Sequence, residues 1–348
     1  MGKKVTIQDI ADALGISRNT VSKAINNSEG LADATREKIL QKAVEMGYKQ
    51  FSYLSALASS ERNAAESTKS RQGFCGEIAL FTTTFLTNSH FASLMLDSFQ
   101  REISQLGYTL NTHRITPENR ETLTLPITFS KERTSAIICI EMFDQTYDEM
   151  VCALGLPVLF VDGPVKIRGD TLSADQLYMD NTSGILALVN SMLSKGIRHI
   201  GFIGDYQHCQ SFFERYMAYR GAMLMAGQPV EERWCVKGIT AEEIAEQLTA
   251  LKELPELFIC ANDFVACDAM RVLCAQGWRV PEDVRISGFD DAPESRNAMP
   301  PLTTVHIHTQ IMAFSAVHLL MSRINQPSLD YRTIYTETEL IWRASTEF

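Results

Sequence analysis

The sequence predicts a small all-α N-terminal domain followed by a two-lobed α/β body built from two doubly wound parallel sheets. Two short helical stretches separated by a glycine open the chain, within residues 6–27. From Gly76 onward, apolar strands alternate with helical stretches, a pattern typical of doubly wound sheets. The expected strands are Ile78–Phe81, Tyr108–Asn111, Ala136–Ile140, Val158–Val161, His199–Ile203, Leu257–Cys260 and Val284–Phe289. The chain has 348 residues, too long for one typical domain of about 100–200 residues. About 270 residues with seven such units are better divided between two lobes than packed on one sheet.

The first two helices are delimited by local signals. Thr6 and Asp9 have the spacing of a capping box, so the first helix is expected to begin after Thr6. Gly15 supplies the backbone freedom for a sharp turn, and Ser17 is the expected cap of the second helix. The residues that point inward at helical spacing are Ile7, Ile10, Ala11, Leu14, Ile16, Val21 and Ile25. A third helix is expected over residues 35–46, which completes a three-helix domain.

The second helix presents one polar face, formed by Arg18, Asn19, Ser22 and Lys23. An arginine, an amide and a lysine near a helix N-terminus match the hydrogen-bonding groups that guanine and adenine present in the DNA major groove. We therefore expect Arg18, Asn19 and Lys23 to contact bases. The side chains expected to contact the DNA backbone are Thr6, Ser17, Thr20, Ser22 and Asn26. On these residues alone, a helical hairpin with a solvated polar face explains the pattern equally well.

Longer motifs resolve that choice by resemblance. TIQDIADALGISRNTVSKAIN, residues 6–26, resembles the helix-turn-helix of the LacI/GalR (lactose-repressor) family of bacterial transcriptional regulators. Motifs similar to the same family continue along the body, among them GIRHIGFIGD, RYMAYRGAM, ANDFVACDAMRVL and RVPEDVRISGFDDAPES. The resemblance implies a body like the periplasmic binding proteins, with a small-molecule effector between two lobes. It also implies a homodimer that binds a pseudo-palindromic DNA operator.

The resemblance divides the chain into segments of distinct roles. The expected segments are the helix-turn-helix domain 1–50, a hinge helix 51–58, a linker 59–75 and an effector-binding and dimerisation domain 76–348. Within that last domain, the expected N-lobe is about 76–178 and 305–330, and the expected C-lobe is about 179–304 and 331–348. The chain is expected to change lobes near Met179, Thr304 and Asp330.

The hinge segment departs from the family pattern. Gln50, Phe51, Leu54 and Ser55 stand where relatives usually have proline, asparagine, alanine and arginine. Leu57 matches the leucine that wedges into the DNA minor groove, and apolar wedges between base steps are a known minor-groove device. A disordered tether is the alternative for this segment. Residues 59–73 contain almost no apolar side chains and are expected to form a flexible linker.

Composition and charge limit the class of protein and its expected location. The chain is 45% hydrophobic and 21% charged, as in ordinary soluble globular proteins. Its net charge of −10 argues against a general nucleic-acid binder, but residues 1–62 carry nine Lys and Arg against seven Asp and Glu. Residues 1–62 therefore have a net charge of +2 and the rest of the chain a net charge of −12. This division is expected of a small DNA-binding domain that depends on dimerisation for its affinity. Without a secretion signal or an apolar membrane span, the protein is expected in the cytoplasm.

The body carries polar residues at the positions where the family binds its effector. By the resemblance, Arg215, Asn262, Asp290 and Asp162 contact the effector, and Phe91 stacks on it. Carboxylates, an amide and one arginine suit a polyhydroxylated ligand, because each buried polar group needs a partner. A sugar or sugar derivative is the first expectation, and a nucleoside or purine the second. For each single residue, a hydrogen bond that stabilises the lobes is the alternative role.

The sequence gives little sign of metal binding, disulfide formation or catalysis. His306 and His308 share a strand face, but the sequence places no third ligand, so no metal site and no cofactor are expected. The eight cysteines form no CxxC pair and are expected to be reduced. The sequence contains no known catalytic motif, so an enzyme is not expected, although a fold alone does not determine function. A cytoplasmic sugar or nucleoside sensor with weak or no DNA binding is the alternative to a DNA-binding regulator.

Overall fold

A computed structural model describes residues 5–25, 31–46, 48, 74–84, 90–166, 169 and 171–347. The expected hinge helix with its wedge Leu57, most of the expected linker, and Asn26 lie outside these residues. Among the described residues, no helix is both long and apolar enough to cross a membrane.

Over the described residues of the N-terminal domain there are three helices, as expected. They are α1 (Ile7–Leu14), α2 (Arg18–Ile25) and α3 (Asp33–Glu45). Their buried core contains Ile10, Ala11, Val21, Ala24, Ile25, Ile39 and Ala43. Gly15 ends α1 at φ +66°, a left-handed conformation that costs a side-chain-bearing residue energy, so the tight turn before α2 depends on this glycine.

The N-lobe contains a six-stranded parallel sheet in the order β11-β5-β4-β3-β1-β2. Its strands are β1 (Gly76–Thr82), β2 (Tyr108–Arg114), β3 (Thr134–Ile140), β4 (Val158–Val161), β5 (Asp175–Met179) and β11 (Thr333–Thr336). Alternate residues of β1 face opposite layers. Ile78 and Leu80 pack in the core that contains Met95 and Phe99, whereas Phe81 packs with Tyr147. The helices are α5 (His90–Gln105), α6 (Pro117–Thr122), α7 (Gln145–Cys152) and α13 (Thr309–Asn325).

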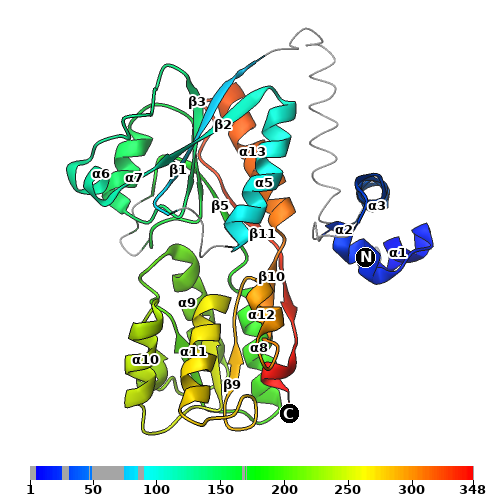
Figure 1. Ribbon diagram of the computed structural model, residues 1–348, viewed down its shortest axis with the longest axis vertical. Coiled ribbons are helices and arrows are strands. Elements are labelled where there is room, and N and C mark those ends of the chain that lie inside the picture. Colours follow the sequence, from blue (N-terminus) through cyan, green and yellow to red (C-terminus); the bar gives the residue numbers. More distant parts are fainter. Residues whose placement is uncertain are drawn as a thin grey trace.

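The C-lobe contains a four-stranded parallel sheet in the order β7-β6-β8-β9. Its strands are β6 (Ile200–Ile203), β7 (Cys235–Val236), β8 (Leu257–Cys260) and β9 (Arg285–Ser287). Its helices are α8 (Ser183–Ser194), α9 (Gln210–Met225), α10 (Ala241–Ala250), α11 (Asp263–Ala275) and α12 (Pro293–Asn297), with short 3-10 turns at Glu232–Trp234 and Ala344–Thr346. Figure 1 shows this lobe below the N-lobe, with α9 at its upper edge, next to the lobe boundary.

The third change of lobe differs from the expectation. Residues 331–348 were expected in the C-lobe, but β11 pairs in parallel with β5, aligning Tyr335 with Tyr178, and extends the N-lobe sheet. The chain therefore leaves that sheet after Thr336 rather than near Asp330. It then forms β12 (Thr338–Ile341), which pairs antiparallel with β10 (Thr304–Ile307). The physical reason is that β11 satisfies the backbone groups along the open edge of β5.

Candidate DNA-binding head and interlobe site

The start of α1 is held by a capping box. The Thr6 amide donates to the Asp9 carboxylate at 2.8 Å, and the Asp9 amide donates to the Thr6 hydroxyl at 3.2 Å. The start of α2 is capped by Ser17, whose hydroxyl accepts from the Thr20 amide at 3.0 Å and lies 2.7 Å from the Thr20 hydroxyl. Three of the side chains expected at the DNA backbone thus also fix the two helices in place.

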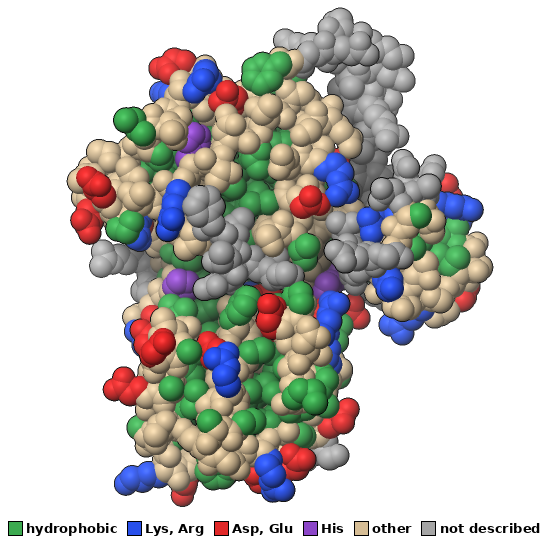
Figure 2. Space-filling model, viewed as in Figure 1, with side chains coloured by type: hydrophobic (Ala, Val, Ile, Leu, Met, Phe, Trp, Pro, Cys, Tyr) green, Lys and Arg blue, Asp and Glu red, His purple; other side chains and the backbone are tan. Residues whose placement is uncertain are grey.

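The polar face of α2 is turned away from the domain core. Val21, Ala24 and Ile25 are buried against the other helices, while Arg18, Asn19 and Lys23 are exposed and Ser22 is half-buried. Figure 2 shows several Lys and Arg side chains on the surface of this domain. The short helix therefore presents donor groups to the outside, as a helix that enters a major groove must.

Arg215 is the centre of the polar site between the lobes. Its side chain is 3% exposed and is held by two hydrogen bonds, from Nε to Asn181 Oδ1 at 2.9 Å and from Nη1 to the Ala261 carbonyl at 2.6 Å. The guanidinium carbon lies 3.5 Å from the centroid of the Phe289 ring. Nη1 lies 3.7 Å from Oδ1 of Asp290, so the two residues form a buried ion pair.

Asp290 has hydrogen-bonding capacity left over. Its side chain is 9% exposed, and its carboxylate forms no hydrogen bond with the described part of the chain. Burial raises the pKa of Asp290 to about 7, with nearby Asp162 and Glu141 adding to the rise and Arg215 opposing it. A carboxylate in this position accepts hydrogen bonds from ligand hydroxyls when it is ionised.

Asp162 and Asn262 both serve as helix caps. Asp162 Oδ1 accepts from the Gly163 amide at 2.8 Å and from the Ser211 amide of α9 at 3.2 Å, which caps a C-lobe helix from the N-lobe. Burial raises the pKa of Asp162. Asn262 Oδ1 accepts from the Val265 amide at 2.9 Å and caps α11. A hydrogen bond that stabilises the lobes was the alternative role expected for each of these residues, and these contacts are of that kind.

The structure brings together Arg215 and Asp290 and places Asp162 close to them. Phe91 is half-buried in the first turn of α5 and packs against the main hydrophobic core. Asn181, which orients Arg215, was not among the expected site residues, because it follows β5 and no strand was expected there. The contact between Phe143 and His208 was not expected either; their rings meet edge to face at 5.0 Å across the lobe boundary.

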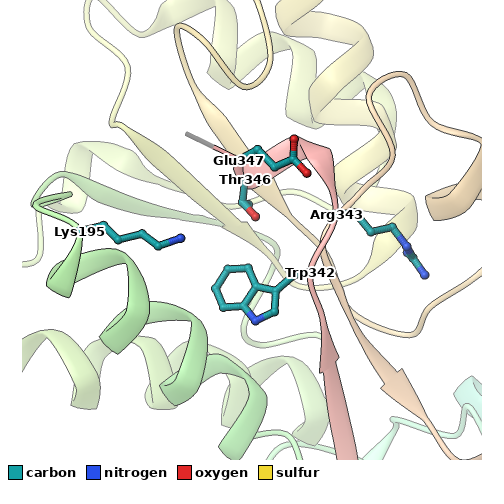
Figure 3. A pocket seen from close by; sticks show the side chains of 5 residues that line it. All are labelled: Lys195, Trp342, Arg343, Thr346 and Glu347. Carbon is teal, nitrogen blue, oxygen red and sulfur yellow. The ribbon is translucent and has the colours of Figure 1, made fainter.

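Two open depressions lie on the surface, and neither is lined by Arg215, Asp290, Asp162 or Asn262. One, of about 510 Å³, is lined by Lys195, Trp342, Arg343, Thr346 and Glu347, with Lys195 Nζ 5.4 Å from the Trp342 ring centroid (Figure 3). Another, of about 530 Å³, lies between α8 and α9. Within the described ranges, no three His, Cys, Asp or Glu side chains are placed to hold a metal ion, and His306 contacts Asp291 at 3.0 Å.

Comparisons with known proteins agree with this arrangement. The family model "Bacterial regulatory proteins, lacI family" matches residues 6–50, and "Periplasmic binding protein-like domain" matches residues 189–346. The HTH-type transcriptional repressor PurR of Mannheimia succiniciproducens is 28% identical over 98% of both chains, and PurR of Vibrio parahaemolyticus is 26% identical over 97% of both.

Solved structures share the fold over the full length. A transcriptional regulator CelR–cellobiose complex has a TM-score of 0.69 at 24% identity, covering 98% of this chain and 99% of that one. The lac repressor dimer bound to operator and the anti-inducer ONPF has a TM-score of 0.64 at 21% identity, covering 99% of both. With its three-helix head and two-lobed parallel-sheet body, the chain belongs to the LacI/GalR family of bacterial transcriptional regulators, which are DNA-binding proteins controlled by small molecules rather than enzymes.

Proposed function

We propose that the protein is a repressor of a sugar-related operon that binds a pseudo-palindromic operator as a homodimer and responds to a sugar or sugar derivative between its lobes. The observation that carries the DNA-binding part is the exposed face of Arg18, Asn19 and Lys23, opposite a fully buried core. A bacterial operator lies in the cytoplasm, which is where we expect the protein to act.

The homodimer follows from the weak charge of a single head. Residues 1–62 have a balance of only +2, whereas the rest of the chain carries −12. Because phosphate contacts supply most non-specific affinity, one head alone would bind DNA weakly. Two heads joined by one pair of bodies would bind two half-sites about one helical turn apart and add their contacts.

The effector part is supported by the pair formed by Arg215 and Asp290. A buried donor fork beside a buried carboxylate with unused acceptor capacity suits a ligand whose hydroxyls both donate and accept. One structure of the same fold contains cellobiose. A nucleoside or purine is the second candidate, because two relatives that align over nearly the whole chain carry the name PurR.

Selection from random duplex DNA tests the reading face, which is the exposed face of α2 formed by Arg18, Asn19 and Lys23. The wild-type protein should enrich a two-fold symmetric site. Arg18→Ala should lose preference at one position of each half-site, because a bidentate base contact contributes about 1–3 kcal/mol of discrimination. Lys38→Ala removes an exposed cation from α3 of the same domain and should leave the preferred sequence unchanged. An unchanged preference in Arg18→Ala would remove Arg18 from the reading face.

A salt titration separates the regulator from the alternative, a sensor with weak or no DNA binding. Binding through phosphate contacts gives a logarithm of affinity that falls linearly with the logarithm of salt concentration. Fluorescence anisotropy on the selected site should show this slope. If no site is enriched and no salt-dependent binding is measured, the sensor is the better description.

Thermal-shift screening against sugars and nucleosides tests the effector class. A ligand that binds only the native state raises apparent stability by mass action, about 2.7 kcal/mol at a hundredfold excess over Kd. The shift should be smaller in Asp290→Asn. Asp283→Asn, which alters an exposed pair with Arg279 in the same lobe, should keep it. A shift with nucleosides alone would exclude the sugar.

A further inference from the structure

A tyrosine hydroxyl forms a hydrogen bond between the two lobes, to the residue that precedes Arg215 in the sequence. Tyr335 lies in β11 of the N-lobe sheet, and its hydroxyl donates to Oε1 of Glu214 in α9 of the C-lobe at 2.8 Å. The Tyr335 side chain is held in place from its own lobe, because its ring stacks on Tyr178 at 5.3 Å. Tyr335 is 50% exposed, and its phenol is a donor at neutral pH, as in any ordinary tyrosine. Partial burial and the neighbouring Glu214 raise the pKa of Tyr335 further.

Glu214 connects this hydroxyl to Arg215 through one buried amide. Its Oε2 accepts from Asn181 Nδ2 at 2.8 Å, and its Oε1 also accepts from Gln210 Nε2 at 2.9 Å. Asn181 Oδ1 in turn accepts from Arg215 Nε at 2.9 Å. The side chain of Asn181 is fully buried, so its amide orientation is determined by these partners.

Asn181 lies where the chain first leaves the N-lobe sheet. Strand β5 ends at Met179 and α8 of the C-lobe begins at Ser183, so Asn181 belongs to a connection between the two lobes. Tyr335 lies beside Tyr178 in the N-lobe sheet, one residue before β11 ends at Thr336. A rotation of the lobes would therefore move both neighbours of Glu214 relative to α9.

The start of α9 is bound to the N-lobe at the same place. The Gln210 amide donates to the Gly163 carbonyl at 2.9 Å, and the Lys166 amide donates to Gln210 Oε1 at 3.0 Å. The Ser211 amide donates to Asp162 at 3.2 Å. Cys209, at the N-cap of α9, forms no side-chain cap, so this helix of 16 residues receives its cap from the opposite lobe.

We propose that Tyr335 and Glu214 form an interlobe latch that holds the lobes together and, through Asn181, sets the position of Arg215. The three are positioning residues, because each acts on the effector site through another side chain. The latch uses a charged acceptor, which makes its hydrogen bonds stronger than those between neutral groups. This inference deepens the proposed function, since Arg215 is the expected effector contact, but its test needs no effector.

Hydrogen exchange of the full-length protein without effector tests the latch. Tyr335→Phe removes one hydroxyl and keeps the ring that stacks on Tyr178. The amides of Gln210, Ser211 and Lys166 should exchange about tenfold faster, because their exchange requires the lobes to separate locally. Tyr147→Phe is the matched control: its hydroxyl donates to the Thr124 carbonyl at 2.9 Å inside the N-lobe. It should leave these three amides unchanged.

A second readout tests the positioning of Arg215. Its Nε–H is bonded to Asn181, whereas the Nε–H of Arg323 is bonded to Asp175 at 3.0 Å within the N-lobe. In Tyr335→Phe, side-chain NMR should show faster exchange of the Arg215 Nε–H and no change for Arg323. Equal acceleration of both protons would indicate general loosening and would overturn the positioning role.

Glu214→Gln provides an independent variant. Its amide would place a donor against the donors of Asn181 or Gln210, so the same amides should lose protection. If Tyr335 and Glu214 act as one unit, the double variant should be no more affected than the more severe single variant. Additive effects, or exchange rates in Tyr335→Phe within twofold of wild type, would refute the latch. A failed sugar and nucleoside panel would refute the proposed effector and leave these measurements interpretable.

Discussion

Asp148 gives the sharpest prediction about stability, because the N-lobe buries its carboxyl group completely. It lies in α7, is 0% exposed, and neither carboxylate oxygen has a hydrogen-bond partner among the described residues. Burial, with a smaller contribution from Asp144, raises the pKa of Asp148 from 3.8 to about 8. The folded protein therefore holds at neutral pH a proton that the unfolded chain releases.

The sign and size of the effect follow from this difference. Because the folded pKa is the higher one, the stabilising contribution of the proton is fully present below about pH 4 and is lost as the pH rises towards 8. At 1.36 kcal/mol per pKa unit, the whole shift corresponds to about 6 kcal/mol, of which about 3 kcal/mol falls between pH 5.5 and pH 8.5. That is a large fraction of the stability of an ordinary domain.

Asp148→Asn tests this reasoning, because asparagine has a similar shape and does not ionise in this range. Wild-type protein should lose Tm between about pH 5.5 and about pH 8.5 by calorimetry, and the variant should lose several degrees less. Asp97→Asn is the control, since it removes an exposed carboxylate from α5 of the same lobe. It should preserve the pH dependence of the wild type.

Two results would refute the argument. If wild type and Asp148→Asn showed the same change in Tm with pH, the Asp148 carboxyl would not be protonated in the folded state. If the variant were less stable than wild type at high pH and equal at low pH, the ionised carboxylate would have a partner that stabilises it.

Three further predictions concern the head, the interlobe site and the thiols. Gly15→Ala should lower the stability of the N-terminal domain by about 1 kcal/mol, measured by thermal melting, because its φ of +66° strains alanine. For any sugar or nucleoside that binds, affinity should rise up to about tenfold from pH 6 to pH 8 as Asp290, with a pKa of about 7, ionises, and titration calorimetry of Asp290→Asn should show no such rise. A thiol reagent followed by mass spectrometry should modify exposed Cys75 and Cys274 before Cys139, Cys209 and Cys260, whose burial raises their thiol pKa well above the usual range.

Local patterns were sufficient for the head and for most of the sheets. The capping box at Thr6 and the turn at Gly15 depend on residues within four positions of each other, so the sequence predicts them directly. Apolar runs likewise predicted β1, β2, β3, β4, β6, β8 and β9. They missed β5, in which Asp175 is buried, because that carboxylate is neutralised by Arg323 and Arg332, about 150 residues away along the chain.

At the interlobe site, local sequence patterns could not predict the hydrogen-bond partners. The sequence placed Asp162 and Asn262 at strand ends, and by resemblance at the effector, yet their oxygens cap α9 and α11. A helix cap supplied from another lobe has no signal in the sequence, because donor and acceptor are 49 residues apart. The same is true of Tyr335 and Glu214, whose partnership depends on β11 joining the N-lobe sheet.

A capped helical head with a polar outer face and a body of alternating strands and helices arise from neighbouring residues, so the amino-acid sequence was enough to predict them. Which polar groups between the lobes already have hydrogen-bond partners could be seen only in the folded protein. In the structure, Asn181 accepts a hydrogen bond from Arg215, and the Asp290 carboxylate can still accept hydrogen bonds. These partnerships depend on how segments that are distant in the sequence pack together at the lobe boundary.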